Sequence, residues 1–275
     1  MEIIHRITTN LTPEMREGLA KIGISAPKSH RNTAQNLHTF VVSESDAAWP
    51  AMQAWVKEHD TVDILRTVFT EEEIAAARWL ELLGTWQHGY PQPRENDFGF
   101  REVTYDLNTW CRTCGGGAKQ KAPFQMKKEP NWEENSILQL HWVHNEFFVT
   151  RTAYEKVFRH FGVKSLEVLS PFGVPLNTVV QLVVDKEVDI DAREMRACDC
   201  DVCGQAKYMP PTRGPFPALC VQPRGHMVKT RQLFGSDHQA IRGVLVSRQL
   251  AKAIQQEHLG GVTFRPVREI AADKI

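Results

Sequence analysis

The sequence predicts a mixed α/β (α+β) fold in two parts. Short apolar stretches alternate with helical patterns over residues 1–85, and a strand-helix-strand pattern occurs twice in the remainder, which also holds all six cysteines. We therefore expect an N-terminal α/β domain over 1–85, a linker over 86–100 and a second domain over 101–275. The second domain divides into two pseudo-repeated units, 101–175 and 176–275.

The N-terminal domain is expected to follow the order β-α-β-α-β-α. Strands are predicted at 2–7, 37–43 and 61–69, and helices after Thr12, at 46–59 and from Thr70 to Gly84. Thr12 is a good N-cap because Pro13 follows at the first helical position. Thr70 precedes three glutamates, which favour a helix start, and Gly84 is a typical helix end. Two prolines and two glycines in 85–100 then predict the linker.

Two segments of the second domain can be aligned, Phe148 to Leu169 and Leu245 to Val267. In each, a strand ends in Val-Thr/Ser-Arg, a helix of about eleven residues follows, and a glycine precedes another strand. A Cys-x-x-Cys-Gly turn precedes each segment. The order of turn, strand, helix and strand therefore predicts an internal duplication.

The candidate metal ligands are Cys111, Cys114, Cys200 and Cys203. Each Cys-x-x-Cys turn is followed by a glycine, which lets the chain reverse tightly behind two thiolates. Together the two turns supply the four ligands of a closed structural Zn²⁺ site, although 86 positions separate Cys114 from Cys200. A redox centre and unrelated buried thiols are the alternatives. The run Gly115–Gly117 argues against a redox centre, because glycine is a poor helix start.

Other thiols and imidazoles are weaker candidates. Cys198 is a bystander or replaces one of the four ligands, and Cys220 is expected to be a buried small apolar residue. His141 and His144 are expected in a strand, where residues three apart point to opposite faces. They are therefore predicted to be neither a shared metal site nor catalytic residues.

Composition excludes several classes of function. Lys plus Arg equals Asp plus Glu at 33 each, which argues against a nucleic-acid or membrane-surface protein. No apolar run has the length of a membrane span, and the N-terminus does not read as a signal peptide, so a cytoplasmic protein is expected. Phosphate-loop, nucleophile-elbow and H-E-x-x-H motifs are absent, and no catalytic residue or cofactor-binding motif is predicted.

The two cysteine turns and the C-terminal LGGVTFRPV together resemble the bacterial double-CXXCG motif proteins. That resemblance implies a zinc-binding, non-catalytic protein that binds a protein partner, and some relatives look like immunity proteins that neutralise a toxin. Our leading hypothesis is therefore a cytoplasmic protein-binding module with a structural Cys₄ zinc site. The alternatives are a zinc-ribbon-like nucleic-acid binder and, less favoured, an enzyme that uses Cys111 as its nucleophile.

Overall fold

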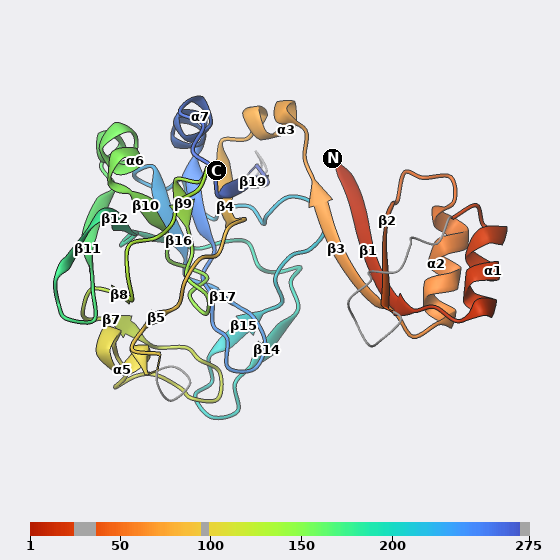
Figure 1. The fold of residues 1–275 in the computed structure, drawn as a ribbon, viewed down its shortest axis with the longest axis horizontal. Helices are drawn as coiled ribbons and strands as arrows, with labels where there is room; N and C mark the ends of the chain where they lie inside the picture. The colour runs from red at the N-terminus through yellow and green to blue at the C-terminus, as the bar shows by residue number, and fades with distance from the viewer. Residues whose placement is uncertain (25–36, 95–98, 270–275) are drawn as a thin grey trace. The chain divides into compact units, whose positions relative to one another are not determined.

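The computed structural model describes residues 1–24, 37–94 and 99–269. These residues form a mixed α/β fold with more strands than helices (Figure 1). The chain divides into two compact units: the first comprises Met1–Glu73 and Pro211–Gly214, and the second comprises Ile74–Pro210 and Pro215–Ile275. This division precedes the predicted linker, of which residues 95–98 lie outside the described residues.

The first unit is a three-stranded sheet with helices on one face (Figure 1). Its elements are β1 (Glu2–Asn10), α1 (Pro13–Lys21), β2 (Leu37–Ser43), α2 (Trp49–Glu58) and β3 (Val62–Val68). The strand order is β2-β1-β3, and β1 is antiparallel to both neighbours. Ile7 and Phe40 from the strands pack with Leu19, Met52 and Trp55 from the helices, so one face of the sheet is buried.

The second unit contains two larger sheets and several short elements. Its helical elements are α5 (Phe100–Thr104), α6 (Arg151–Lys156), η1 (Phe158–Phe161) and α7 (Arg248–Gln256), while α3 (Glu71–Ala76) leads into it. Its first strands are β4 (Trp79–Gly84), β5 (Pro91–Gln92), β6 (Tyr105–Asp106), β7 (Lys119–Gln120), β8 (Gln125–Met126), β9 (Ile137–Leu138), β10 (Phe148–Thr150) and β11 (Lys164–Leu169). The others are β12 (Pro175–Val183), β13 (Glu187–Val188), β14 (Ala197–Asp199), β15 (Ala206–Tyr208), β16 (Met227–Thr230), β17 (Leu233–Phe234), β18 (Val244–Ser247) and β19 (Val262–Pro266).

The predicted helix from Thr70 to Gly84 is wrong in its second half. Thr70 does cap a helix, since its Oγ1 accepts a hydrogen bond from the Glu73 backbone at 3.2 Å, but α3 ends at Ala76 and β4 follows. β4 is paired on both edges, with β18 and with β19. Because Trp79 and Leu80 are both buried although they point to opposite faces, this strand is a continuous apolar run that resembles a buried helix in sequence.

The two predicted strand-helix-strand segments are present and have the same pairing pattern. In β10-α6-β11 the helix is capped by Thr150, whose side chain accepts from Ala153 N, and in β18-α7-β19 by Ser247, which accepts from Leu250 N. In each segment one strand lies between the two and is antiparallel to both. That strand is β12 between β10 and β11, and β4 between β18 and β19.

We divide the second unit between β11 and β12, so that each half contains one middle strand, one cysteine turn and one strand-helix-strand segment. With this division, the middle strands are exchanged between the halves. β4 precedes the first cysteine turn in the chain but lies in the sheet of the second segment, and β12 precedes the second cysteine turn but lies in the sheet of the first. The registers match: Val180 is opposite Val149, and Leu80 is opposite Val246. This reciprocal exchange makes the two halves interdependent.

The two sheets share one apolar core, which includes residues of α6 and α7. Leu80, Val149, Val180 and Val246 all belong to it. Two further clusters each belong to one sheet, and each contains a fully buried phenylalanine that follows a proline. These are Phe124, whose carbonyl accepts from Leu169 N at 2.9 Å, and Phe216, whose carbonyl accepts from Arg268 N at 2.8 Å.

Candidate metal centre

Each cysteine turn lies at the tip of a short antiparallel hairpin. The first turn, Cys111–Gly115, lies between β6 and β7, and the second, Cys200–Gly204, lies between β14 and β15. In both, the glycine N–H donates to the carbonyl of the first cysteine, at 2.7 Å in the first turn and 2.8 Å in the second. Both glycines have positive φ, 78° and 70°, so the sequence signal of a closing glycine has a conformational cause.

The structure brings all four predicted ligands together. The Sγ atoms of Cys111 and Cys200 are 3.8 Å apart, and those of Cys114 and Cys203 are 3.6 Å apart. All four sulfur atoms lie within 4.8 Å of one another. A tetrahedral ion with metal–sulfur bonds of about 2.3 Å would place its ligands about 3.8 Å apart. A disulfide needs about 2.05 Å. The cluster therefore fits a metal ion such as zinc, and the cysteines are free thiols.

The pairing of cysteines follows the repeat. The first cysteine of one turn contacts the first of the other, and the second contacts the second. This is the arrangement expected when two similar hairpins meet about an approximate twofold axis. The two turns are far apart in sequence because each carries its own strand-helix-strand segment.

The thiols do not ionise alike. Hydrogen bonds from the backbone N–H groups of Cys114 and Thr113 lower the pKa of the Cys111 thiol to about 6. At Cys203 the backbone of Gln205 favours the thiolate, but partial loss of hydration at the sulfur and the neighbouring thiols outweigh it and raise the pKa to about 12. One thiolate forms easily while another resists ionisation, as expected where like charges repel unless a cation is shared.

The two remaining cysteines stay outside the cluster. Cys198 is exposed, and its Sγ lies 3.9 Å from the carbonyl of Asp199 instead of facing the four sulfur atoms. It does not replace a ligand in this arrangement. Cys220 is also exposed, so the expectation that it is a buried apolar residue is wrong. Within the cluster, Cys114 is buried and Cys203 is the most accessible.

A buried lysine next to the cluster was not predicted. The ammonium of Lys207, on β15, donates to the carbonyl oxygen of Cys114 at 3.1 Å, to that of Gln239 at 3.0 Å and to that of Asp237. Only 7 % of this residue is exposed, and no carboxylate among the described residues pairs with it. A buried cation normally needs a counter-charge. Four thiolates with one divalent cation carry a net charge of −2 and would supply it.

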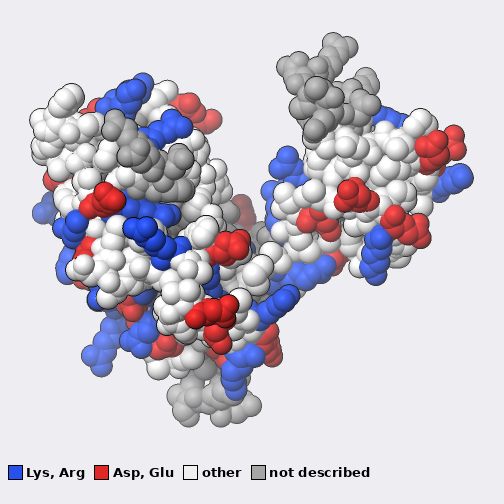
Figure 2. All heavy atoms as spheres, turned by 90° about the horizontal axis from the view of Figure 1, so that it is seen from below, with Lys and Arg blue, Asp and Glu red and all other residues white. Residues whose placement is uncertain are grey.

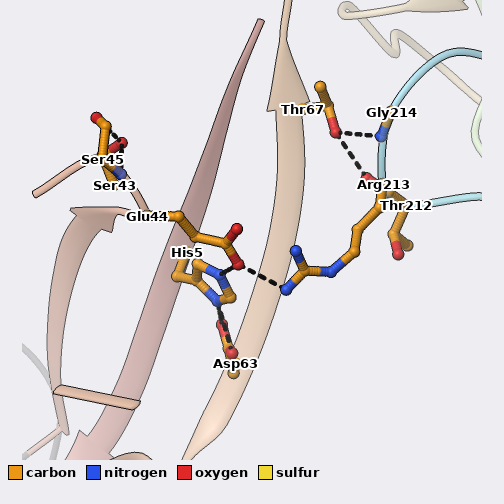
Figure 3. Close-up of polar contacts among 9 residues, drawn as sticks. All are labelled: His5, Ser43, Glu44, Ser45, Asp63, Thr67, Thr212, Arg213 and Gly214. Atoms are coloured by element: carbon orange, nitrogen blue, oxygen red, sulfur yellow. Dashed lines mark hydrogen bonds and ion pairs between the residues drawn. The ribbon is translucent and has the colours of Figure 1, made fainter. Parts of the chain in front are cut away.

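A second polar cluster, in the first unit, has a different character (Figure 3). His5 is 3 % exposed, and its Nδ1 lies 2.8 Å from Asp63 while its Nε2 lies 2.9 Å from Glu44. Arg213 donates to Glu44 at 2.6 Å, and Thr67 accepts a hydrogen bond from Gly214 N at 2.9 Å. Both ring nitrogens of His5 are already bonded, so the ring has no free atom for substrate. The cluster holds Pro211–Gly214 on the first unit.

His141 lies in a turn and His144 in the irregular segment between that turn and β10, so the predicted strand is wrong there. The turn contains Trp142 with a positive φ of 69°, which a strand does not allow. Burial, with a smaller contribution from His141, lowers the pKa of His144. Neither histidine belongs to a cluster of metal-ligating groups among the described residues.

No protein family model matches the chain, and no curated protein matches it either. In the part of the chain that the structure describes, no helix combines the length and apolar composition that a membrane span requires.

Proposed function

We propose that this chain is a non-catalytic zinc-binding protein in which a Cys₄ site joins two duplicated halves and the resulting surface binds a partner protein. The observation that carries the proposal is the convergence of four sulfur atoms within 4.8 Å from two matched turns. Four thiolates would complete the tetrahedral coordination of zinc, so no position would stay open for substrate. Such a site is structural, because catalytic zinc keeps one exchangeable position.

The ligands also support a thiophilic metal such as zinc over magnesium or calcium. Thiolate sets of this kind select zinc or iron, whereas carboxylates and carbonyls select magnesium or calcium. Zinc would link the hairpins β6-β7 and β14-β15 at one end of the second unit, away from α6 and α7 (Figure 1). The exchanged strands β4 and β12 hold the halves at the sheets. The metal and the strand exchange are thus two independent connections between the halves.

The resemblance to double-CXXCG proteins supports a more specific role, that of an immunity protein that neutralises a toxin. Such a protein protects the cell that makes it from toxin delivered by neighbouring cells. A strain that lacks this gene should therefore lose viability when it is mixed with its parent and should survive in pure culture. Expression of the intact chain should restore survival.

A chain with Cys111 and Cys200 both replaced by serine lacks one ligand in each turn and should fail to protect. The matched control is Cys198→Ser, which lies outside the cluster and should protect fully. Equal survival of the deletion strain and its parent would contradict the immunity role and leave the zinc site unaffected.

A second candidate is nucleic-acid binding, favoured by a cavity of about 690 Å³ beside the first cysteine turn. Arg101 and Arg112 both stand over the Trp110 ring at this cavity, with their guanidinium carbons 5.2 and 5.9 Å from its centroid. Basic and aromatic side chains together can hold a strand of nucleic acid. Retention of the protein on single-stranded DNA that falls steeply with salt would support this candidate, and no retention at low salt would contradict it.

A further inference from the structure

The sheet of the first unit has one face that none of the described residues of this unit covers. Side chains alternate along a strand, so Ile7, which packs against the helices, points away from Arg6 and Thr8. Directly opposite residues share a face, and Arg6 is opposite both Val41 on β2 and Ile64 on β3. We call the face that carries Arg6, Thr8, Val41, Ile64 and their neighbours the open face.

The chain segment that returns to this unit leaves the open face uncovered. Pro211–Gly214 is held by Thr67 and Glu44 (Figure 3). Thr67 is opposite Ile3, so it points to the same side as Ile7. The Thr67 side chain that bonds this segment therefore points to the helix side of the sheet, away from the open face.

The open face is unusually apolar for a surface. Val41, Val62 and Ile64 are 60 %, 61 % and 55 % exposed, and Val68 is 39 % exposed. Four of the twelve exposed large apolar residues among the described residues thus lie on one face of one small sheet. Scattered apolar residues need no explanation, but these four gather on one small sheet face with Arg6 and Arg66 between them, which makes a mixed apolar and basic patch suited to an interaction site.

The charges on this face identify the chemistry of the partner. Arg6 lies between Val41 and Ile64, and Arg66 is opposite Ile4, next to them. Both arginines are exposed, and neither guanidinium forms a hydrogen bond or ion pair with a described residue. Figure 2 shows Lys and Arg atoms interspersed with uncharged and acidic ones on the surface of this unit. The acid of this face, Glu2, lies at its end opposite Val68.

The same residues argue against nucleic acid at this place. The strand positions on the open face are occupied by isoleucine, valine, leucine, threonine, serine, asparagine, arginine and one glutamate. None has a ring on which a base can stack, and stacking is the usual means by which an open sheet holds single strands. Unpaired arginines among aliphatic side chains fit carboxylates among aliphatic side chains instead.

We propose that the open face, centred on Arg6 and Arg66, is the docking surface for a partner protein that presents acidic side chains within an apolar patch. This inference rests on the proposed protein-binding role. Three strands give a face of roughly 14 Å by 20 Å. That is small compared with the about 800 Å² per partner of a stable complex. Binding through this face alone is therefore expected to be weak and best observed by NMR.

The probe is a defined peptide added to the full-length, methyl-labelled protein. It is an amphipathic helical peptide with a leucine stripe flanked by glutamates, compared with the same peptide carrying lysines in place of the glutamates. The glutamate peptide should shift the methyl signals of Val41, Val62 and Ile64 in a saturable manner. It should bind at least about tenfold more tightly than the lysine peptide, and added salt should reduce the difference.

Variants connect the effect to the arginines. Arg6→Glu combined with Arg66→Glu should weaken the glutamate peptide about tenfold or more and improve the lysine peptide. Lys57→Glu makes the same change of charge on the exposed part of α2 and should alter neither peptide by more than about twofold. Ile64→Ser keeps the charge and should also weaken binding. Retained methyl dispersion shows that each variant is folded.

Four results would overturn the proposal: equal binding of the two peptides, shifts confined to other methyl groups, no effect of the double arginine variant, or stronger shifts of the same methyls by an oligothymidine. This test is independent of the metal site, since the first unit contains none of the six cysteines. A failure here leaves the zinc proposal standing, and missing zinc leaves this proposal standing.

Discussion

The ammonium group of Lys207 donates a hydrogen bond to the backbone carbonyl of Cys114, one of the four clustered cysteines. Its remaining partners are also neutral carbonyls, so its charge is available to offset the negative charge of the thiolates. Lys207→Met should therefore weaken metal binding by about 10- to 100-fold, the usual cost of losing an outer partner of a metal site. Competition with a chromophoric chelator measures this.

Lys119 supplies the control for Lys207. It lies on the hairpin of the first cysteine turn but is exposed. Lys119→Met should change metal affinity by less than about threefold, because water screens an exposed charge. If Lys207→Met binds metal as tightly as the natural chain, the lysine does not compensate the thiolates.

Loss of a single ligand should destabilise the second unit. Cys200→Ser should lower both metal content and the free energy of unfolding, because structural zinc binding is coupled to folding. A loss of about 3 kcal/mol or more in urea unfolding is expected. Cys198→Ser, two positions away and exposed, should unfold like the natural chain. Equal stabilities for the two variants would show that the cluster does not hold the fold together.

Glu81 makes stability depend on pH. Burial raises its pKa from the ordinary 4.5 to about 7, an effect that Arg265, at 3.4 Å, only partly offsets. Between these two values the folded protein keeps a proton that the unfolded chain has lost. The free energy of unfolding should therefore fall as pH rises from about 4.5 to 7, by a total on the order of 3 kcal/mol. Urea unfolding at pH 5 and pH 8 tests this.

The comparison of β4 with β12 shows which residue can replace Glu81 in the unfolding experiment at two pH values. Gln181 occupies the position in β12 that Glu81 occupies in β4, since the two are opposite Phe148 and Leu245 in matching registers. Glu81→Gln should therefore be accommodated and should reduce the pH dependence, with the larger gain in stability at pH 8. Glu194→Gln, at an 84 % exposed carboxylate, should leave the dependence unchanged. A natural chain equally stable at both pH values would contradict this account.

The helix caps test the equivalence of the two halves. Thr150 and Ser247 each accept a hydrogen bond from the backbone N–H three residues ahead. Replacing either with alanine should cost about 1 kcal/mol in the free energy of unfolding. Because the halves share a core, both substitutions should shift the same cooperative transition, and the double variant should lose about the sum. Two separate transitions would show that the halves unfold independently.

The four ligands of the metal cluster could be predicted from the sequence because each Cys-x-x-Cys-Gly turn is a local pattern. A glycine after the second cysteine is required by the left-handed backbone of each turn, so the turn can be recognised in four or five residues. The caps at Thr150 and Ser247 are equally local. Lys207 carries no such signal, because its partners Cys114 and Gln239 are distant in sequence.

The error at β4 has a different origin from those at His141 and Cys220, because it concerns a strand whose partners are distant in sequence. The sequence of β4 predicts a helix because both faces of this strand are apolar, and the partners that bury them, β18 and β19, lie near the other end of the chain. The strand exchange has no local sequence signal for the same reason. The matching Pro-Phe pairs that end at Phe124 and Phe216 are visible in the sequence, but only the contacts with Leu169 and Arg268 show that they are equivalent.

The central claim is that Cys111, Cys114, Cys200 and Cys203 hold one zinc ion. The most direct test is the metal content of protein purified without added zinc, measured together with its reactive thiols. We expect one zinc per chain and two reactive thiols of the six, Cys198 and Cys220, which are exposed and outside the cluster. A chelator should release the metal and expose the other four. Less than about half an equivalent of metal, with all six thiols reactive from the start, would contradict the claim.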